Sequence, residues 1–173
     1  GDGSLGLLFC GRGAGSPDRK NWPQILKEKL KNEFSFRGTM GSDVVLGMDY
    51  WKMMLSAKAG LNLSQRNDVT LYTSERIAQL AGNGVPVITP KVPELNLIFP
   101  ENTVCYVDSA EEAASAYLEL VKNEDQRRAI GKRGRECAHL KSNAIRLAQY
   151  MLDLIEGNSI DPTIEWKEHI FKK

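Results

Sequence analysis

A loop that combines glycines with positive charge follows the first apolar run of the sequence. This stretch, GRGAGSPDRK, supplies backbone that a ligand can approach closely and cations that can bind a phosphate: Gly11, Gly13, Gly15, Arg12, Arg19 and Lys20. Backbone N–H groups and basic side chains of this kind hold a phosphate or diphosphate without covalent chemistry. A flexible loop with solvated charges is the alternative interpretation of these residues.

A second group of polar residues lies in SERIAQLAGNGVPVIT, residues 74–89. The pattern predicts a helix over residues 74–81, then a glycine stop, then a buried strand over residues 85–89. Arg76 and Gln79 are three residues apart, so they share one face of this helix. A solvated helix face is the alternative interpretation of this pair.

Hydroxyl groups precede the same helix. Thr73 and Ser74 stand where a side-chain oxygen can cap the first turn or contact a phosphate beside the helix N-terminus. Ser64 ends an apolar run, LNLS, which we interpret as a strand. Because ligands of an open parallel sheet bind beyond the carboxyl ends of its strands, all three residues are candidate ligand contacts.

The elements that would position these residues alternate between apolar strands and amphipathic helices. Strands are predicted over residues 5–11, 34–38, 61–64, 85–89 and 103–108, and helices over residues 22–32, 49–60, 74–81, 109–123, 124–140 and 142–157. This alternation, with short connections, favours an α/β fold: a doubly wound, Rossmann-like parallel sheet followed by C-terminal helices. Pro23 is expected in the first turn of its helix, and Asp49 and Gly60 are expected to cap the next one.

One domain is expected over residues 1–157, followed by a tail over residues 158–173. The tail is interrupted by a proline but carries four large apolar residues, Ile164, Trp166, Ile170 and Phe171. Such a segment should pack against this domain or against a partner.

Other phosphate-binding folds agree less well with the sequence. A nicotinamide dinucleotide fold needs a third glycine where Ser16 stands, and an acid where the second strand ends in Arg37. The P-loop motif G-x-x-x-x-G-K-[ST] does not occur. A receiver domain would need an aspartate in place of Ser64 and paired acids in place of Gly-Arg-Gly.

Charge and composition disfavour further classes of protein. The 173 residues carry 23 basic and 22 acidic side chains, a net charge of +1, which gives no electrostatic footprint for nucleic acid. No apolar run approaches the roughly 20 residues that span a bilayer, and the first residues do not resemble a signal peptide. Cys10, Cys105 and Cys137 are spaced too widely for a metal or redox motif, which favours thiols in a reducing cytoplasm.

Several segments together resemble the C-terminal, donor-binding half of GT-B glycosyltransferases, and most closely the spore-maturation-type subgroup of the group 1 enzymes. The segments AKAGLNLS, SERIAQLAGNGVPVIT, VPELNLIF and VCYVDSAEEAASAYLELVKNEDQRRAIGKRGREC follow the order of that family. The resemblance extends from about Leu5 to Glu156 and is strongest from Ala57 to Cys137. It implies a domain that binds a nucleoside diphosphate sugar.

The resemblance also implies roles for individual residues. Arg76 occupies the position of an arginine that lies toward the donor, and Gln79 the position of an acid that binds the nucleotide ribose. Backbone near Val85 would contact the base. Arg12 and Lys20, together with Arg76, would stabilise the departing diphosphate. No D-x-D motif occurs, in agreement with GT-B enzymes that use cations of the protein, so we expect no metal cofactor.

Two functions remain open. Glutamine replaces the acid at position 79, and Leu71 stands where the better-known group 1 pattern has a second acid. A GT-B enzyme closes two domains around its substrates and 173 residues supply one, so an N-terminal acceptor domain or a partner chain should complete a working transferase. The alternative is a degenerate, non-catalytic module with a structural or partner-binding role. A nicotinamide-binding domain with altered glycine spacing is a third possibility.

Overall fold

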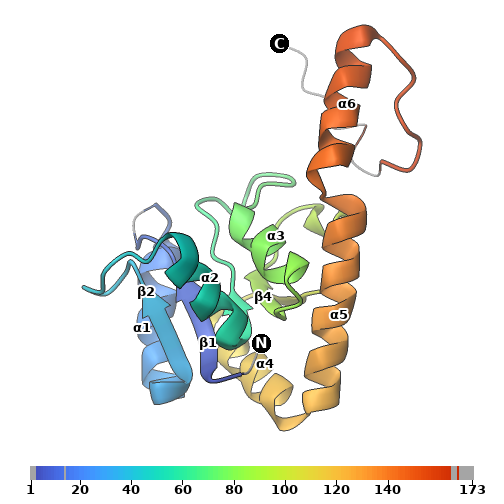
Figure 1. The fold of residues 1–173 in the computed structure, drawn as a ribbon. Helices are drawn as coiled ribbons and strands as arrows, with labels where there is room; N and C mark the ends of the chain where they lie inside the picture. The colour runs from blue at the N-terminus through green and yellow to red at the C-terminus, as the bar shows by residue number, and fades with distance from the viewer. Residues whose placement is uncertain (1–2, 14, 165–166, 168–173) are drawn as a thin grey trace.

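Five parallel strands form one sheet, in the order β2-β1-β3-β4-β5, in the computed structural model, which describes residues 3–13, 15–164 and 167 (Figure 1). The strands are β1 (Leu5–Cys10), β2 (Phe34–Arg37), β3 (Ala57–Leu61), β4 (Val87–Pro90) and β5 (Cys105–Val107). β1 pairs with both β2 and β3, so the strand order reverses beside β1. Such a reversal opens a crevice where open α/β sheets bind ligands.

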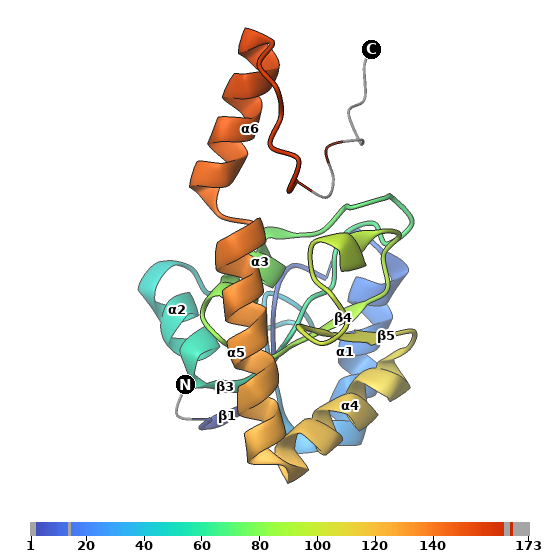
Figure 2. The same cartoon turned by 90° about the vertical axis from the view of Figure 1, so that its right-hand side faces the viewer.

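Helices cover both faces of the sheet, which confirms the predicted doubly wound fold (Figure 2). α1 (Pro17–Leu30) and α4 (Ala110–Lys122) pack on one face. α2 (Gly47–Ser56), α3 (Glu75–Gly82) and α5 (Glu124–Lys141) pack on the other. Two short 3₁₀ turns, η1 (Lys31–Glu33) and η2 (Leu95–Leu97), and a last helix, α6 (Ala144–Glu156), complete the described elements.

The central strands are apolar on both sides because both faces are covered. Along β1, Leu7 and Phe9 enter the core under α1 and α4, whereas Leu8 enters the core under α2 and α3, and all three are at most 2% exposed. On β3, Gly60 leaves room for Leu80 of α3, since a Cβ atom at Gly60 would lie 2.4 Å from Leu80 Cδ2. The missing side chain therefore lets α3 lie close to the sheet.

Two predicted boundaries around α2 are wrong. The third strand is AKAGL, not LNLS, and α2 begins at Gly47 and ends before this strand instead of extending from Asp49 to Gly60. Three of the five residues of AKAGL are alanine or glycine, and four of the five are buried, as expected for a central strand that is covered on both faces. Asn62 and Ser64 lie just beyond the strand, where their side chains join a polar network.

The start of α1 also differs from the prediction. Ser16 caps the helix by accepting a hydrogen bond from the Arg19 backbone N–H at 3.3 Å, and Pro17 takes the first helical position. Pro23 is therefore inside the helix instead of in its first turn. Arg19 and Lys20, which we predicted in a loop, belong to α1 and therefore point in different directions. Arg19 is buried and Lys20 is exposed.

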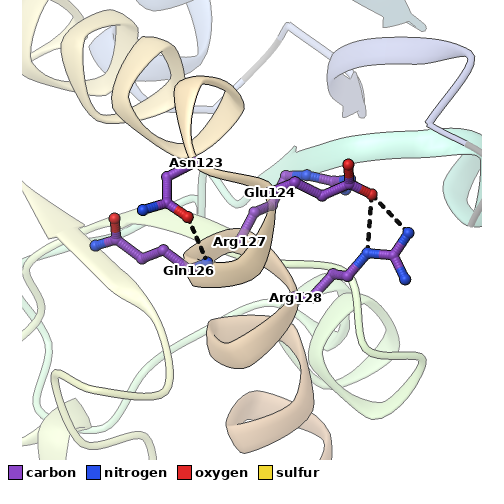
Figure 3. Close-up of polar contacts among 5 residues, drawn as sticks. All are labelled: Asn123, Glu124, Gln126, Arg127 and Arg128. Carbon is purple, nitrogen blue, oxygen red and sulfur yellow. Dashed lines mark hydrogen bonds and ion pairs between the residues drawn. The ribbon is translucent and has the colours of Figure 1, made fainter.

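A single residue joins α4 to α5. Asn123 ends α4, and its side chain accepts a hydrogen bond from the Gln126 backbone N–H at 3.0 Å (Figure 3). The same view shows Glu124 in contact with Arg128. The Glu124–Arg128 ion pair is 2.5 Å long, and a longer one of 3.7 Å joins Glu124 to Arg127. Acidic neighbours thus offset part of the positive charge of α5, in keeping with a solvated face.

The last described elements extend away from the sheet. α6 projects beyond the domain body in both views (Figures 1 and 2) and ends at Gly157 in the left-handed conformation. The chain then returns along α6, where Arg146 Nη2 donates to the Thr163 carbonyl at 2.6 Å and Ile164 is 2% exposed. The remaining apolar residues predicted for the tail, Trp166, Ile170 and Phe171, lie outside the described residues. Across the described ranges, no helix is long and apolar enough to cross a membrane.

Candidate functional site

A cavity of about 550 Å³ opens at the carboxyl edge of the sheet, beside the reversal of strand order. It is bounded by the end of β1, the segment that joins β2 to α2, the first turns of α2, and the N-terminal half of α3. Five predicted site residues line it: Gly11, Arg12, Ser74, Arg76 and Gln79. Two segments that are at least 62 residues apart in the sequence therefore meet at one site, as the strand-end rule predicts.

Arg76 is the central cation of this cavity. Its Nε donates to the Cys10 carbonyl at 2.8 Å, and its Nη1 lies 3.3 Å from both the Leu63 carbonyl and Ser74 Oγ. The guanidinium also stacks over the Phe9 ring, with its Cζ 5.1 Å from the ring centroid. These contacts fix the guanidinium in place before any ligand is present.

Gly11 gives the guanidinium its space. A Cβ atom at Gly11 would lie 2.6 Å from Arg76 Nη2 and 3.4 Å from Arg19 Nη2. The first turn of α3 and the glycine loop can approach each other only because this side chain is missing. We predicted that Gly11 lets a ligand approach the backbone closely. In the structure, the group that approaches Gly11 is the guanidinium of Arg76.

Arg19 brings a second guanidinium to the same place. It is 8% exposed, and its Nε donates to the Leu63 carbonyl at 3.0 Å, the same acceptor that Arg76 uses. Burial lowers the pKa of Arg76, and the charge of Arg19 lowers it further. The buried Arg19 and the partly buried Arg76 thus place two like charges beside Gly11, and their positive potential favours an anion.

The predicted hydroxyl groups form a network with a residue that the sequence analysis missed. Asn62 donates to Thr73 Oγ1 at 3.2 Å and accepts from Ser74 Oγ at 2.6 Å. Ser64 Oγ accepts from the Ser74 backbone N–H at 3.1 Å and lies 3.4 Å from Thr73 Oγ1. Ser64 and Thr73 therefore support the start of α3 from beneath, and only Ser74 reaches the cavity. The sequence does contain a signal that could have identified Asn62, because this polar residue lies within the apolar run LNLS at the end of a strand.

Tyr50 is a second residue that the sequence analysis missed. It lies on α2, lines the cavity, and donates from its hydroxyl to Gln79 Oε1 at 2.9 Å. Burial raises the pKa of Tyr50, although the charge of Arg76 acts in the opposite direction. The hydroxyl therefore keeps its proton at neutral pH. No sequence signal marked it, because tyrosine on an amphipathic helix usually belongs to the core.

The side of the cavity opposite α3 is apolar and open to solvent. Val44 and Leu46 line it from the irregular segment before α2, and they are 51% and 77% exposed. Arg37, at the end of β2, and the exposed Arg12 add positive charge at this rim. On the α3 side, Glu75 lines the cavity with a carboxylate. The cavity thus combines an apolar surface with several cations, a composition suited to an anionic ligand with an aromatic or aliphatic part.

Three predicted site residues lie elsewhere. Lys20 points to solvent from α1, and Gly13 lies against Thr39, whose Oγ1 would be 2.7 Å from an added Cβ atom. Val85 is 3% exposed, donates its N–H to the Leu80 carbonyl at 3.0 Å, and precedes β4 at the opposite edge of the sheet. None of the three lines the cavity.

Metal-binding side chains do not gather at any one place in the described part of the chain. It contains no cluster of three or more histidine, cysteine, aspartate or glutamate side chains that could hold a metal ion. None of Cys10, Cys105 and Cys137 forms a disulfide.

Comparison with solved structures identifies the architecture. A sucrose-phosphate synthase from Thermosynechococcus elongatus matches 90% of this chain with a TM-score of 0.58 and 18% identity. HepE from Anabaena, solved in complex with UDP-glucose, matches 90% with a TM-score of 0.69 and 11% identity. The chain covers 46% and 49% of these two proteins, so it spans about half of their length.

A third structure consists of a single domain. The C-terminal domain of a group 1 family glycosyl transferase, LpcC from Francisella tularensis, matches 82% of this chain and is itself 88% covered, with a TM-score of 0.57 and 13% identity. A comparison with curated protein sequences finds no match.

At these identities the solved structures establish the fold alone, a Rossmann-like domain of the GT-B type. The family assignment comes from a sequence model of the glycosyl transferase-like family, which matches residues 11–153. The matched region includes the glycine loop, every described strand after β1, and the helix that carries Arg76. The chain therefore belongs to the glycosyl transferase-like family.

Proposed function

We propose that this chain is the donor-binding half of a group 1, spore-maturation-type glycosyltransferase, with a nucleoside diphosphate sugar bound in the cavity. The placement of Arg76 carries the proposal. Its guanidinium lies at the N-terminal end of α3, and its hydrogen-bond partners are neutral oxygens of Cys10, Leu63 and Ser74. Within the described residues, no carboxylate forms an ion pair with it. A diphosphate is the ligand that this charge and helix terminus favour.

The proposed chemistry is stabilisation of the leaving group. In glycosyl transfer the bond between the sugar's anomeric carbon and a phosphate oxygen breaks, and its electron pair remains on the diphosphate. Negative charge on that oxygen grows in the transition state, so fixed cations stabilise the transition state more than the bound donor. Arg76 and Arg12 line the cavity for this role, and Arg19 adds charge behind Gly11. Protein cations would then take the place of a metal ion.

A companion domain would complete the enzyme, as an acceptor domain on the same polypeptide or on a partner chain. The support is that the chain spans about half of the two solved proteins that it matches over 90% of its length. α6 offers a docking surface, because Ile145, Leu147, Met151 and Ile155 are 50–83% exposed on a helix that projects from the body. We expect the chain alone to bind donor without releasing the diphosphate, which an assay for free nucleotide would detect.

Calorimetric titration with nucleoside diphosphates and their sugars tests the proposal directly. We expect saturable binding of one nucleotide, and Arg76→Ala should lower its affinity about 10–100-fold because a hydrogen-bonded charge is lost. Lys20→Ala is the control, since it removes an exposed cation of α1 that does not line the cavity. Equal losses in both variants would contradict the site. Failure of the folded chain to bind any nucleotide would contradict the function and leave a non-catalytic module.

A further inference from the structure

Asn62 lies behind the wall of the cavity and is 1% exposed. Its amide nitrogen donates to Thr89 Oγ1 at 3.0 Å and to Thr73 Oγ1 at 3.2 Å, and its side-chain oxygen accepts from Ser74 Oγ at 2.6 Å. Both protons of the amide are therefore engaged. In a buried network of this kind, the direction of each hydrogen bond determines what the next group can still donate or accept.

The direction of these bonds is set from β4. A carbonyl oxygen only accepts, so the Thr89 hydroxyl gives its single proton to the Pro90 carbonyl, at 3.3 Å. The Thr89 oxygen then accepts from Asn62, which turns the amide oxygen of Asn62 toward Ser74. Ser74 must donate its own proton to that oxygen. Four hydrogen bonds thus run in one direction, from Arg76 through Ser74 and Asn62 to Thr89 and Pro90.

Ser74 therefore faces the cavity with an oxygen whose proton is already used. Its side chain does not cap α3 either. Its lone pairs remain, and Arg76 Nη1 donates to them at 3.3 Å. Among the nitrogens of the guanidinium, only Nη2 has no hydrogen-bond partner within the described residues. Nη2 faces the glycine loop, 2.6 Å from the place of a Cβ atom at Gly11.

From this chain of bonds we infer that Asn62 is a positioning residue for anion binding. By taking the proton of Ser74, it makes Ser74 an acceptor that holds Arg76 Nη1, and Nη2 is left to bind a phosphate. The inference rests on the proposed function, because that function makes Arg76 the contact for the diphosphate. It assigns Ser74 to the support of Arg76, so the phosphate contact predicted for Ser74 becomes an indirect one.

A double-mutant cycle between Asn62 and Ser74 tests the inference, with inorganic pyrophosphate as the probe. Calorimetric titration compares wild type, Asn62→Ala, Ser74→Ala and the double variant. We expect each single variant to bind about 3–10-fold more weakly, because each removes the oriented acceptor of Arg76. The double variant should bind within about twofold of the weaker single variant, since both changes break the same link. Losses that multiply in the double variant would overturn the inference.

A second background distinguishes positioning from general support of the fold. Arg76→Lys keeps the charge but lacks the planar fork that bonds to Ser74. In a chain with this change, Asn62→Ala should cause no further loss of pyrophosphate affinity. A further loss of the same size as in wild type would show that Asn62 does not act through the guanidinium, and would overturn the inference.

Thr103→Val is the control for the loss of a buried hydroxyl. Thr103 is 7% exposed and donates to the Pro100 carbonyl at 2.7 Å, away from the cavity, so this variant should bind pyrophosphate as wild type does. Chemical denaturation establishes that each variant is folded. Where Asn62→Ala does not fold, Asn62→Ser replaces it in both tests, because its hydroxyl ends one bond short of the amide oxygen.

Pyrophosphate also separates this inference from the proposed function, because it carries the diphosphate without a nucleoside. Multiplying losses in a chain that binds both pyrophosphate and a nucleotide overturn only the role of Asn62. The expected coupling in a chain that binds no nucleotide supports that role and contradicts donor binding. A wild-type chain that binds neither overturns the proposed function, and the role of Asn62 with it.

Discussion

The two sides of the cavity are built in different ways. The inner wall, formed by the end of β1 and the start of α3, consists of partly buried groups that are held by hydrogen bonds within the protein: Cys10, Ser74, Arg76 and Gln79. The outer wall, formed by residues 37–47, has no regular structure after β2 and presents exposed side chains. Several of its residues have positive φ angles: Gly38, Met40, Gly41 and Gly47.

The two walls differ in what they contribute to binding: the inner wall recognises charge, and the outer wall provides apolar contact. The inner wall is organised before a ligand arrives, so its charges act without a further cost of ordering. The outer wall exposes apolar surface that becomes buried only when a ligand or a second domain covers it, and its contribution comes from that burial. Charge recognition is therefore a property of the domain itself, whereas contact with the base depends on what covers the site.

Removing a guanidinium from each wall should give the largest contrast. Arg76→Met removes the side-chain donor to the Cys10 carbonyl and one of the two donors to the Leu63 carbonyl, and we expect the free energy of unfolding to fall by about 1–3 kcal/mol. Arg37→Met removes an exposed cation of the outer wall and should change it by less than about 0.5 kcal/mol. Chemical denaturation of both variants measures the difference. Similar values would mean that the two walls are equally ordered.

Substituting one glycine in each wall should give effects of intermediate size. The inner-wall variant should lose nucleotide affinity, whereas the outer-wall variant should lose stability. Gly11→Ala places a Cβ atom 2.6 Å from Arg76 Nη2, so the guanidinium must move, and nucleotide affinity should fall about 10-fold. Gly47→Ala meets no atom within 4 Å but has a φ of +59°, so it should cost about 1 kcal/mol of stability and leave affinity nearly unchanged. Calorimetry and thermal unfolding of the pair distinguish the two effects. The distinction fails if Gly47→Ala weakens binding as much as Gly11→Ala.

The smallest effect is expected for the apolar residues of the outer wall. Leu46 is 77% exposed, so Leu46→Ser should leave stability within about 0.5 kcal/mol of wild type. Nucleotide affinity should fall only about twofold to threefold in the isolated chain, because little apolar area is removed from water there. Calorimetric titration measures this loss. A loss as large as that of the Arg76 variants would show that the outer wall already encloses the ligand.

The fold was largely predictable because its signals are local. Continuous apolar runs and helix signals identified the order of strands and helices. The helix predicted from residue 109 does begin there, because Ser109 caps α4 by accepting from the Glu112 N–H. The third strand was misplaced because AKAGL has little apolar bulk, and its strand character depends on Leu80 filling the space above Gly60. That contact joins residues 20 positions apart, which a local pattern does not report.

The site was predictable in part for a related reason. Strand-end position and helix phase were enough to bring Arg76, Gln79 and Gly11 to one cavity. The choice between Arg19 and Lys20 required the exact start of α1, since a shift of one residue rotates a helical side chain by about 100°. Tyr50 could be assigned only from the packing of α2 against α3, which depends on the tertiary structure.

Gly60 has a consequence for how related sites could diverge. The height of α3 above the sheet depends on the slot that this glycine leaves for Leu80, and the 2.8 Å bond from Arg76 Nε to the Cys10 carbonyl depends on that height. An alanine at position 60 would lift the helix and widen the cavity without altering any group that lines it. Pocket width is thus adjustable from the hydrophobic core, and residues 60 and 80 should covary across homologues whose donors differ in size.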